Sequence, residues 1–129
     1  MKTAIIYKSK SGSTKQYSQW LHESVINSDL FDMNDFPKSS IDQYCTFIIG
    51  SYEICGEVPA FDFITSVWDI VKDKKIYIFR VGLIPEDSKY SQDTFNKLPE
   101  EIRSKVKFIK LPGQINNPFN KIGFKIFAK

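Results

Sequence analysis

The chain has 129 residues, 18 basic against 15 acidic, and a net charge of +3, which predicts one mildly basic domain over residues 1–129. Hydrophobic residues make up 42% of it, so it can bury a core of its own. This composition excludes a disordered chain, a collagen-like fibre and a disulfide scaffold, and no apolar run reaches the ~18 residues that cross a bilayer. The spacing of Cys45 and Cys55 is not that of metal ligands, and we expect no signal peptide. The two cysteines therefore predict free thiols in a reducing cytoplasm.

The first third of the chain predicts a strand, a helix and a second strand. Residues 3–7 form a short apolar run that ends in a Ser/Gly/Lys cluster, as in a strand buried on both faces. Residues 13–27 have helical apolar spacing, and we expect Ser11 or Ser13 to be the N-cap. Residues 30–33 predict the second short strand.

The middle of the chain repeats this pattern. Residues 46–50 are wholly apolar up to a closing glycine and predict the third strand. Pro59 is well placed to start a helix over 59–71, because proline lacks the N–H that the first helical position leaves unpaired. The residues expected on the inner face of that helix are Phe63, Val67 and Ile70.

The last third predicts two strands and two helices. Strands are expected over 75–81 and 107–111, and a helix over 92–104 that Pro99 breaks or kinks. Residues 118–129 predict a short final helix. Five apolar strands that alternate with helices indicate an α/β domain with a parallel sheet and helices on both faces.

In such sheets, ligands bind beyond the carboxyl ends of the strands, which directs attention to the loops 8–14, 51–57 and 82–90. The first of these loops concentrates hydroxyl groups and one glycine at the start of a helix, where backbone amides and the helix dipole favour a phosphate. It has neither the P-loop nor the dinucleotide-binding pattern. An ordinary serine-rich turn with a capping serine is the open alternative.

This loop, Ser9-Lys10-Ser11-Gly12-Ser13-Thr14, resembles the flavin mononucleotide (FMN) phosphate loop of flavodoxins, [Ser/Thr]-x-[Ser/Thr]-Gly-x-Thr, at every position. Residues 48–52 are similar to the start of the second flavodoxin loop. Residues 81–86 and 98–107 look like one branch of the family, small flavodoxin-domain proteins related to the quinone-dependent protoporphyrinogen oxidases.

The resemblance implies a flavodoxin-like, doubly wound five-stranded parallel sheet of order 2-1-3-4-5. It also implies non-covalent FMN and electron transfer with redox partner proteins or a small-molecule donor or acceptor. Gly56 would be the glycine whose peptide turns toward flavin N5 on reduction. The residues expected at FMN are Ser9, Lys10, Ser11, Gly12, Ser13, Thr14, Ser51, Tyr52, Glu53, Ile54, Cys55, Gly56, Val81, Gly82 and Leu83.

The second loop departs from the flavodoxin pattern. Ile54 stands where flavodoxins usually place an aromatic ring against the flavin, with Tyr52 nearby and Tyr90 as a candidate for the other face. Glu53 and Glu57 flank the expected flavin. As a hypothesis, both carboxylates would disfavour the reduced anion and make the flavin a stronger reductant; two solvated loop charges are the alternative.

Two other functions stay open at this point: a protoporphyrinogen-oxidase-type flavoenzyme linked to quinone, and a flavin-free binding or regulatory module on the same fold. After Glu101 the chain has seven basic residues and no acid. The basic tail 118–129 suits either a sheet-covering helix or an anionic membrane surface. With Arg80 and Arg103 as the only arginines, we expect no nucleic-acid partner.

Overall fold

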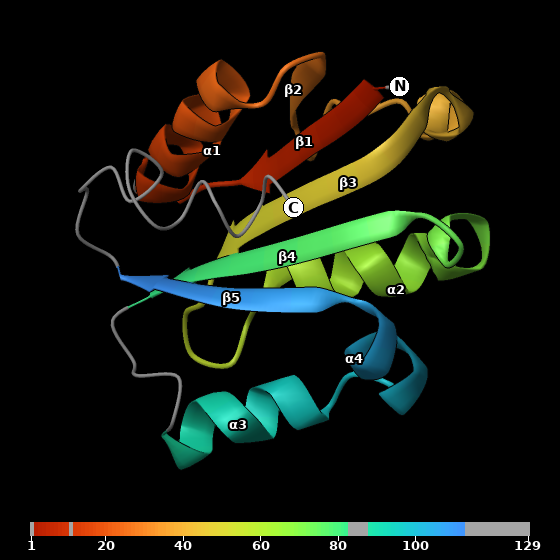
Figure 1. Ribbon diagram of the computed structural model, residues 1–129. Helices are drawn as coiled ribbons and strands as arrows, with labels where there is room; N and C mark the ends of the chain where they lie inside the picture. The colour runs from red at the N-terminus through yellow and green to blue at the C-terminus, as the bar shows by residue number, and fades with distance from the viewer. Residues whose placement is uncertain (1, 11, 83–87, 113–129) are drawn as a thin grey trace.

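The computed structural model describes residues 2–10, 12–82 and 88–112. Its centre is a five-stranded parallel sheet of order β2-β1-β3-β4-β5 (Figure 1). The strands are β1 (Lys2–Lys8), β2 (Ser28–Asp32), β3 (Tyr44–Tyr52), β4 (Lys75–Gly82) and β5 (Lys107–Pro112). This order confirms the predicted doubly wound topology, in which strands are added to one side of β1 first and then to its other side, so that the strand order reverses between β1 and β3.

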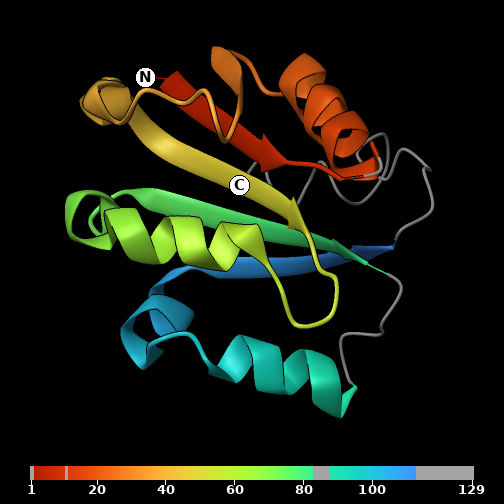
Figure 2. The same ribbon diagram turned by 180° about the vertical axis from the view of Figure 1, so that it is seen from behind.

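Helices cover both faces of the sheet. The described helical elements are α1 (Ser13–Ser24), the short 3-10 helix η1 (Lys38–Gln43), α2 (Pro59–Val71), α3 (Lys89–Asn96) and α4 (Glu100–Lys105). Helix α1 lies on one face, and α2 lies on the other, where Figure 2 shows it in front of the strands. None of the helices in the described part of the chain has the length and apolar character that a membrane span needs.

Two apolar clusters, one on each face, hold the sheet between its helices. In β3, Phe47 and Ile49 pack into the larger cluster with α2, whereas Ile48 packs into the smaller one with Tyr17 and Leu21 of α1. Strands covered on both faces need apolar residues at successive positions, so their sequences are continuous apolar runs and do not alternate.

Two expectations about the helices need correction. Ile70 is 57% exposed and not on the inner face of α2, because the buried positions Ile64, Val67 and Val71 form a stripe on the other side of the helix. The first helix ends at Ser24 and not near residue 27, because Val25 is already in an extended conformation.

Pro99 separates α3 from α4, which confirms the predicted break, and it lies at the N-cap of α4. The predicted final helix over 118–129 lies outside the described residues.

Candidate functional site

The loop after β1 leaves the start of α1 open. Gly12 is the N-cap residue, with φ +99°, and it has no side chain that could form a cap hydrogen bond. The prediction of a serine cap is therefore wrong: Ser13 is already the first helical residue, and Ser11 lies outside the described residues. A Cβ added to Gly12 would meet no atom of the described residues within 4 Å. This combination of an uncapped helix end and open space is what an anion site requires.

The hydroxyl groups of this loop lie at different depths. The Gly12 amide donates a hydrogen bond to Ser9 Oγ over 3.0 Å, which closes the loop on itself. Ser9 and Ser13 are half-buried, whereas Thr14 is only 2% exposed. The exposed Lys10 ammonium lies 5.5 Å from the centre of the Tyr52 ring, so this loop reaches the end of β3.

The segment after β3 is a two-residue hairpin, residues 54–57. The Ile54 and Glu57 amides donate to each other's carbonyl oxygens over 3.0 and 2.9 Å. Between them, Cys55 has φ +52° and Gly56 φ +79°, as in the type I′ turn that closes tight hairpins. The hairpin thus projects from the carboxyl end of β3 in a fixed conformation.

The hairpin presents one apolar side chain and approaches a tyrosine of α3. Ile54 is 41% exposed and Tyr90 47% exposed. A Cβ added to Gly56 would lie 3.3 Å from the Tyr90 hydroxyl. Ile54 and Tyr90, the two residues predicted to face the flavin ring, are therefore both exposed: Ile54 is part of this hairpin and Tyr90 lies next to it.

The outer flank of the hairpin is tied to β3 by a side-chain hydrogen bond. The Tyr52 hydroxyl donates to Glu57 Oε1 over 3.0 Å. Burial of the phenol, together with this bond to a carboxylate, raises the pKa of Tyr52. Cys55 is an exposed free thiol and Cys45 a partly buried one.

Glu53 has a different environment from the one expected of a loop residue. Its carboxylate is fully buried and forms ion pairs with Arg80, 3.0 Å away, and with Lys110; the Ser91 hydroxyl donates to it over 3.3 Å. Glu53 is thus not a solvated loop charge. Two cations offset the charge of its carboxylate, so Glu53 does not act on the reduced flavin as the hypothesis states. Of the two carboxylates in that hypothesis, Glu57 remains.

The other predicted residues of the second and third loops are held inside the protein. Ser51 Oγ accepts a hydrogen bond from the Ala60 amide at the start of α2, and Val81 is in the core. Gly82 is required for packing, since a Cβ there would lie 3.0 Å from the Glu53 carbonyl oxygen. Leu83 falls outside the described residues.

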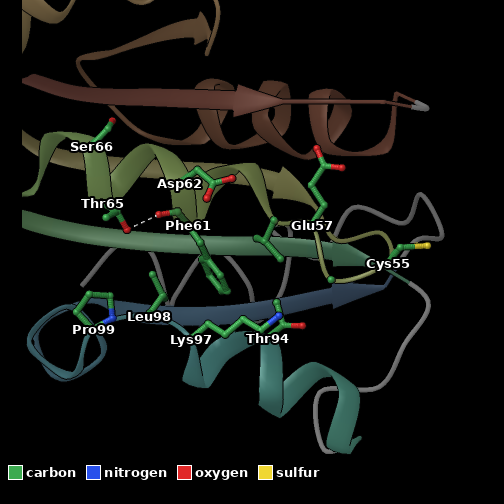
Figure 3. Close-up of a pocket in the computed structure, with 12 residues that line it drawn as sticks. Cys55, Glu57, Phe61, Asp62, Thr65, Ser66, Thr94, Lys97, Leu98 and Pro99 are labelled. Carbon is green, nitrogen blue, oxygen red and sulfur yellow. Dashed lines mark hydrogen bonds between the residues drawn. The ribbon is translucent and has the colours of Figure 1, made fainter.

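Two hollows flank the hairpin. A groove of about 780 Å³ lies between α2 and the end of α3 with the segment that follows it, and side chains such as Phe61, Thr65 and Lys97 line its walls (Figure 3). A smaller hollow of about 340 Å³ includes Lys8 and Tyr52. Glu57 lines both hollows. Among the described residues, no group of three or more His, Cys, Asp and Glu side chains is arranged to hold a metal ion.

Sheet register brings the three loops together. Lys8 of β1 pairs with Ser51 of β3, and Tyr52 pairs with Val81 of β4, so the three strands end at neighbouring positions. Sequence reasoning directed attention to these three loops, and the register confirms that they lie at one end of the sheet. It missed Arg80 and Lys110, although a basic residue inside each of two apolar strands was a signal.

Comparisons with known proteins agree with this geometry. A search of curated proteins gives no significant match. Among solved structures, oxidised Flavodoxin 2 from Bacillus cereus has a TM-score of 0.63 at 23% identity, covering 90% of this chain and 88% of its own. A flavodoxin from the domain Archaea has a TM-score of 0.63 at 14% identity, covering 92% and 85%. The flavodoxin of Streptococcus pneumonia TIGR4 has a TM-score of 0.63 at 14% identity, covering 90% and 88%.

These likenesses establish the fold, and a family model adds the assignment. The model of the flavodoxin domain matches residues 4–121, which is most of the chain and includes all three loops. FMN is the cofactor that this family implies, and the open helix end at Gly12 suits its phosphate. The chain therefore belongs to the flavodoxin domain family.

Proposed function

We propose that the protein is an FMN-binding electron carrier. The observation that carries the proposal is the uncapped start of α1 at Gly12, adjacent to the rigid hairpin 54–57. An anion-binding helix end next to an exposed Ile54 and Tyr90 suits a ligand with a phosphate at one end and a flat apolar ring at the other.

Each segment has a distinct part in this proposal. The first-turn amides of α1 and the Ser9 and Ser13 hydroxyls would hold the phosphate, with Lys10 at the rim. Ile54 and Tyr90 would contact the ring, and Gly56, the glycine of the hairpin, is the position at which a peptide rotation toward the ring would meet the least steric resistance. FMN supplies the redox chemistry, while the protein binds, orients and tunes it.

Flavodoxins pass electrons to redox partner proteins, and we propose the same type of partner here, or a small-molecule donor or acceptor. Two free thiols support a reducing, cytoplasmic location for the protein. The resemblance of 81–86 and 98–107 to the protoporphyrinogen-oxidase-related branch extends the proposal to that group of small flavodoxin-domain proteins.

The test of electron transfer is reoxidation of the reduced, FMN-loaded protein. The loaded protein is reduced anaerobically with dithionite, freed of excess reductant and unbound flavin, and mixed with cytochrome c as a one-electron protein acceptor. We expect cytochrome c reduction in proportion to the bound FMN. Protein that carries FMN but leaves cytochrome c and small-molecule acceptors oxidised would contradict the carrier role.

A further inference from the structure

A buried charge cluster lies beneath the hairpin. Glu53, Arg80 and Lys110 stand at the carboxyl ends of β3, β4 and β5, and their side chains meet on the α2 side of the sheet, where Arg80 lies beside Phe61 and Phe95. The side chains of Arg80 and Lys110 are each 8% exposed, and that of Glu53 is fully buried. The cluster therefore joins three strands at the end of the sheet that carries the proposed flavin site.

Helix α3 completes the cluster. The Ser91 hydroxyl donates to the Glu53 carboxylate, and an Arg80 guanidinium nitrogen donates to the Ser91 carbonyl oxygen over 3.3 Å. The guanidinium carbon also lies 5.6 Å from the centre of the Phe61 ring and 5.9 Å from that of Phe95. Arg80 is thus packed between α2 and α3 while it pairs with Glu53.

Glu53 fixes the backbone on both sides of the hairpin site. Its amide donates to the Val81 carbonyl oxygen over 2.9 Å, and the next residue, Ile54, starts the hairpin. Ser91 directly follows Tyr90, whose hydroxyl adjoins Gly56. The Glu53 carboxylate is thus linked to Ile54 through the chain and to Tyr90 through Ser91.

We propose that Glu53 is a positioning residue whose buried carboxylate, held by Arg80, Lys110 and Ser91, fixes Ile54 and Tyr90 relative to each other and so shapes the ring end of the flavin site. The inference rests on the proposed function, since it assigns the ring to this hairpin. Removing one member of a buried, hydrogen-bonded charge network leaves the others uncompensated, so the network resists displacement of any one of them.

The first test measures the hairpin without flavin, by amide hydrogen exchange in the full chain. In Glu53→Gln, the Ile54 and Glu57 amides should exchange about tenfold faster, because a neutral amide loses the charge-assisted bonds that hold β3 to β4 and β5. The Ile48 amide in the core serves as the reference. The control is Glu101→Gln, which removes an exposed carboxylate that pairs with Lys105 at 3.8 Å; it should leave hairpin exchange unchanged.

The second test separates the ring end from the phosphate end. Glu53→Gln should weaken FMN and riboflavin binding by the same factor, about tenfold, because only the ring contacts are disturbed. It should also shift the midpoint potential of bound FMN. The double variant Glu53→Gln/Lys110→Met also removes the ammonium that the single variant leaves unpaired. It should recover part of the protection from exchange and reverse part of the change in midpoint potential. It also allows the test to be made if Glu53→Gln alone does not fold.

The outcomes of these tests distinguish a failure of the positioning role of Glu53 from a failure of the proposed FMN-binding function. A parent chain that binds no FMN overturns the proposed function and the flavin part of the inference with it. A parent that binds FMN, with variants whose hairpin exchange and potential match the parent, overturns the positioning role alone. Faster hairpin exchange in Glu53→Gln, recovered in the double variant together with the potential, supports it.

Discussion

The two loops that meet at the carboxyl ends of β1 and β3 are built in opposite ways. The loop before α1 relies on backbone: Gly12 gives the helix no side-chain cap, and no atom of residues 2–10, 12–82 or 88–112 would lie within 4 Å of a Cβ there. The hairpin 54–57 relies on side chains, with Glu53 buried in an ion cluster on one flank and Tyr52 bonded to Glu57 on the other.

This difference indicates a division of labour between the ends of one ligand. A phosphate is bound by amides that are already aligned, so its loop needs freedom for the backbone and little packing. A ring whose electronic properties are to be tuned needs a rigid environment, so its loop is anchored into the core. Variants can test each half of this contrast separately.

The largest effect is expected from Gly50→Ala in β3, the strand that leads to the hairpin. The added Cβ would lie 2.0 Å from the Phe79 ring, which is fully buried and cannot move aside. We expect a loss of roughly 2–3 kcal/mol in the free energy of unfolding, as for an overpacked core. Urea unfolding measures it, and Gly50→Ala/Phe79→Leu should recover part of the loss. Unchanged stability of the single variant would show that the core here yields to added volume.

Gly12→Ala should damage the phosphate end and spare the hairpin. Space is available for the methyl group, but φ +99° is unfavourable for an L residue by ~1–2 kcal/mol, so the loop should shift. We expect FMN to bind about tenfold more weakly and riboflavin as before, measured by fluorescence titration. An equal loss for both ligands would contradict the assignment of the phosphate to this loop.

The hydrogen bond from Tyr52 to Glu57 should contribute less to stability at high pH, and Tyr52→Phe should remove this pH dependence of the stability. The folded pKa of Tyr52 lies above its ordinary value of 10.0, first because of burial and then because of the bond to Glu57. Its contribution to stability is therefore complete below pH 10 and is lost as the pH rises through the folded pKa.

The measurement is thermal stability of the parent and of Tyr52→Phe between pH 8 and 11, where the two curves should converge at the alkaline end. At pH 8 the variant should be less stable by about 0.5–1.5 kcal/mol, as for one lost hydrogen bond. Parallel curves over the whole range would exclude a role for Tyr52 ionisation. Tyr90→Phe, which removes the hydroxyl of another exposed tyrosine beside the hairpin, is the matched control.

Lys10→Gln should have the smallest effect. Lys10 is exposed, and its ammonium lies 5.5 Å from the centre of the Tyr52 ring, a contact worth about 0.5–1 kcal/mol at an exposed site. FMN affinity should fall about threefold at low salt and less at high salt, because screening weakens an exposed charge. A loss that is independent of salt would point to packing on Tyr52 as the main contribution of Lys10.

The sequence predicts the fold well because its local signals agree with one another. Pro59 starts α2 and Val71 ends it as predicted, and Pro99 separates two helices. Ile70 is the exception: an apolar residue at near-helical spacing lies outside the buried stripe, and only the packing of α2 on the sheet decides which side of the helix faces in.

The candidate site is predictable where it depends on backbone and less so where it depends on distant pairing. The glycine of the first loop, Gly12, has a positive φ that suits this residue type, and it takes the N-cap position that was predicted for a serine. The partners of Glu53 lie 27 and 57 residues away in the sequence, so no local pattern could connect them. The available signal was position: β4 and β5 each begin with a lysine, and Arg80 and Lys110 are the basic residues that interrupt the apolar run inside each strand.

The most direct test of the account is a parallel titration of the parent chain with FMN and riboflavin, followed by flavin fluorescence and by thermal stability. We expect FMN to bind with quenched fluorescence and a raised melting temperature, and riboflavin to bind more weakly by the contribution of the phosphate. Equal affinity for both ligands would contradict the phosphate site at Gly12. No binding of FMN at high micromolar concentration would contradict the proposed function as a whole.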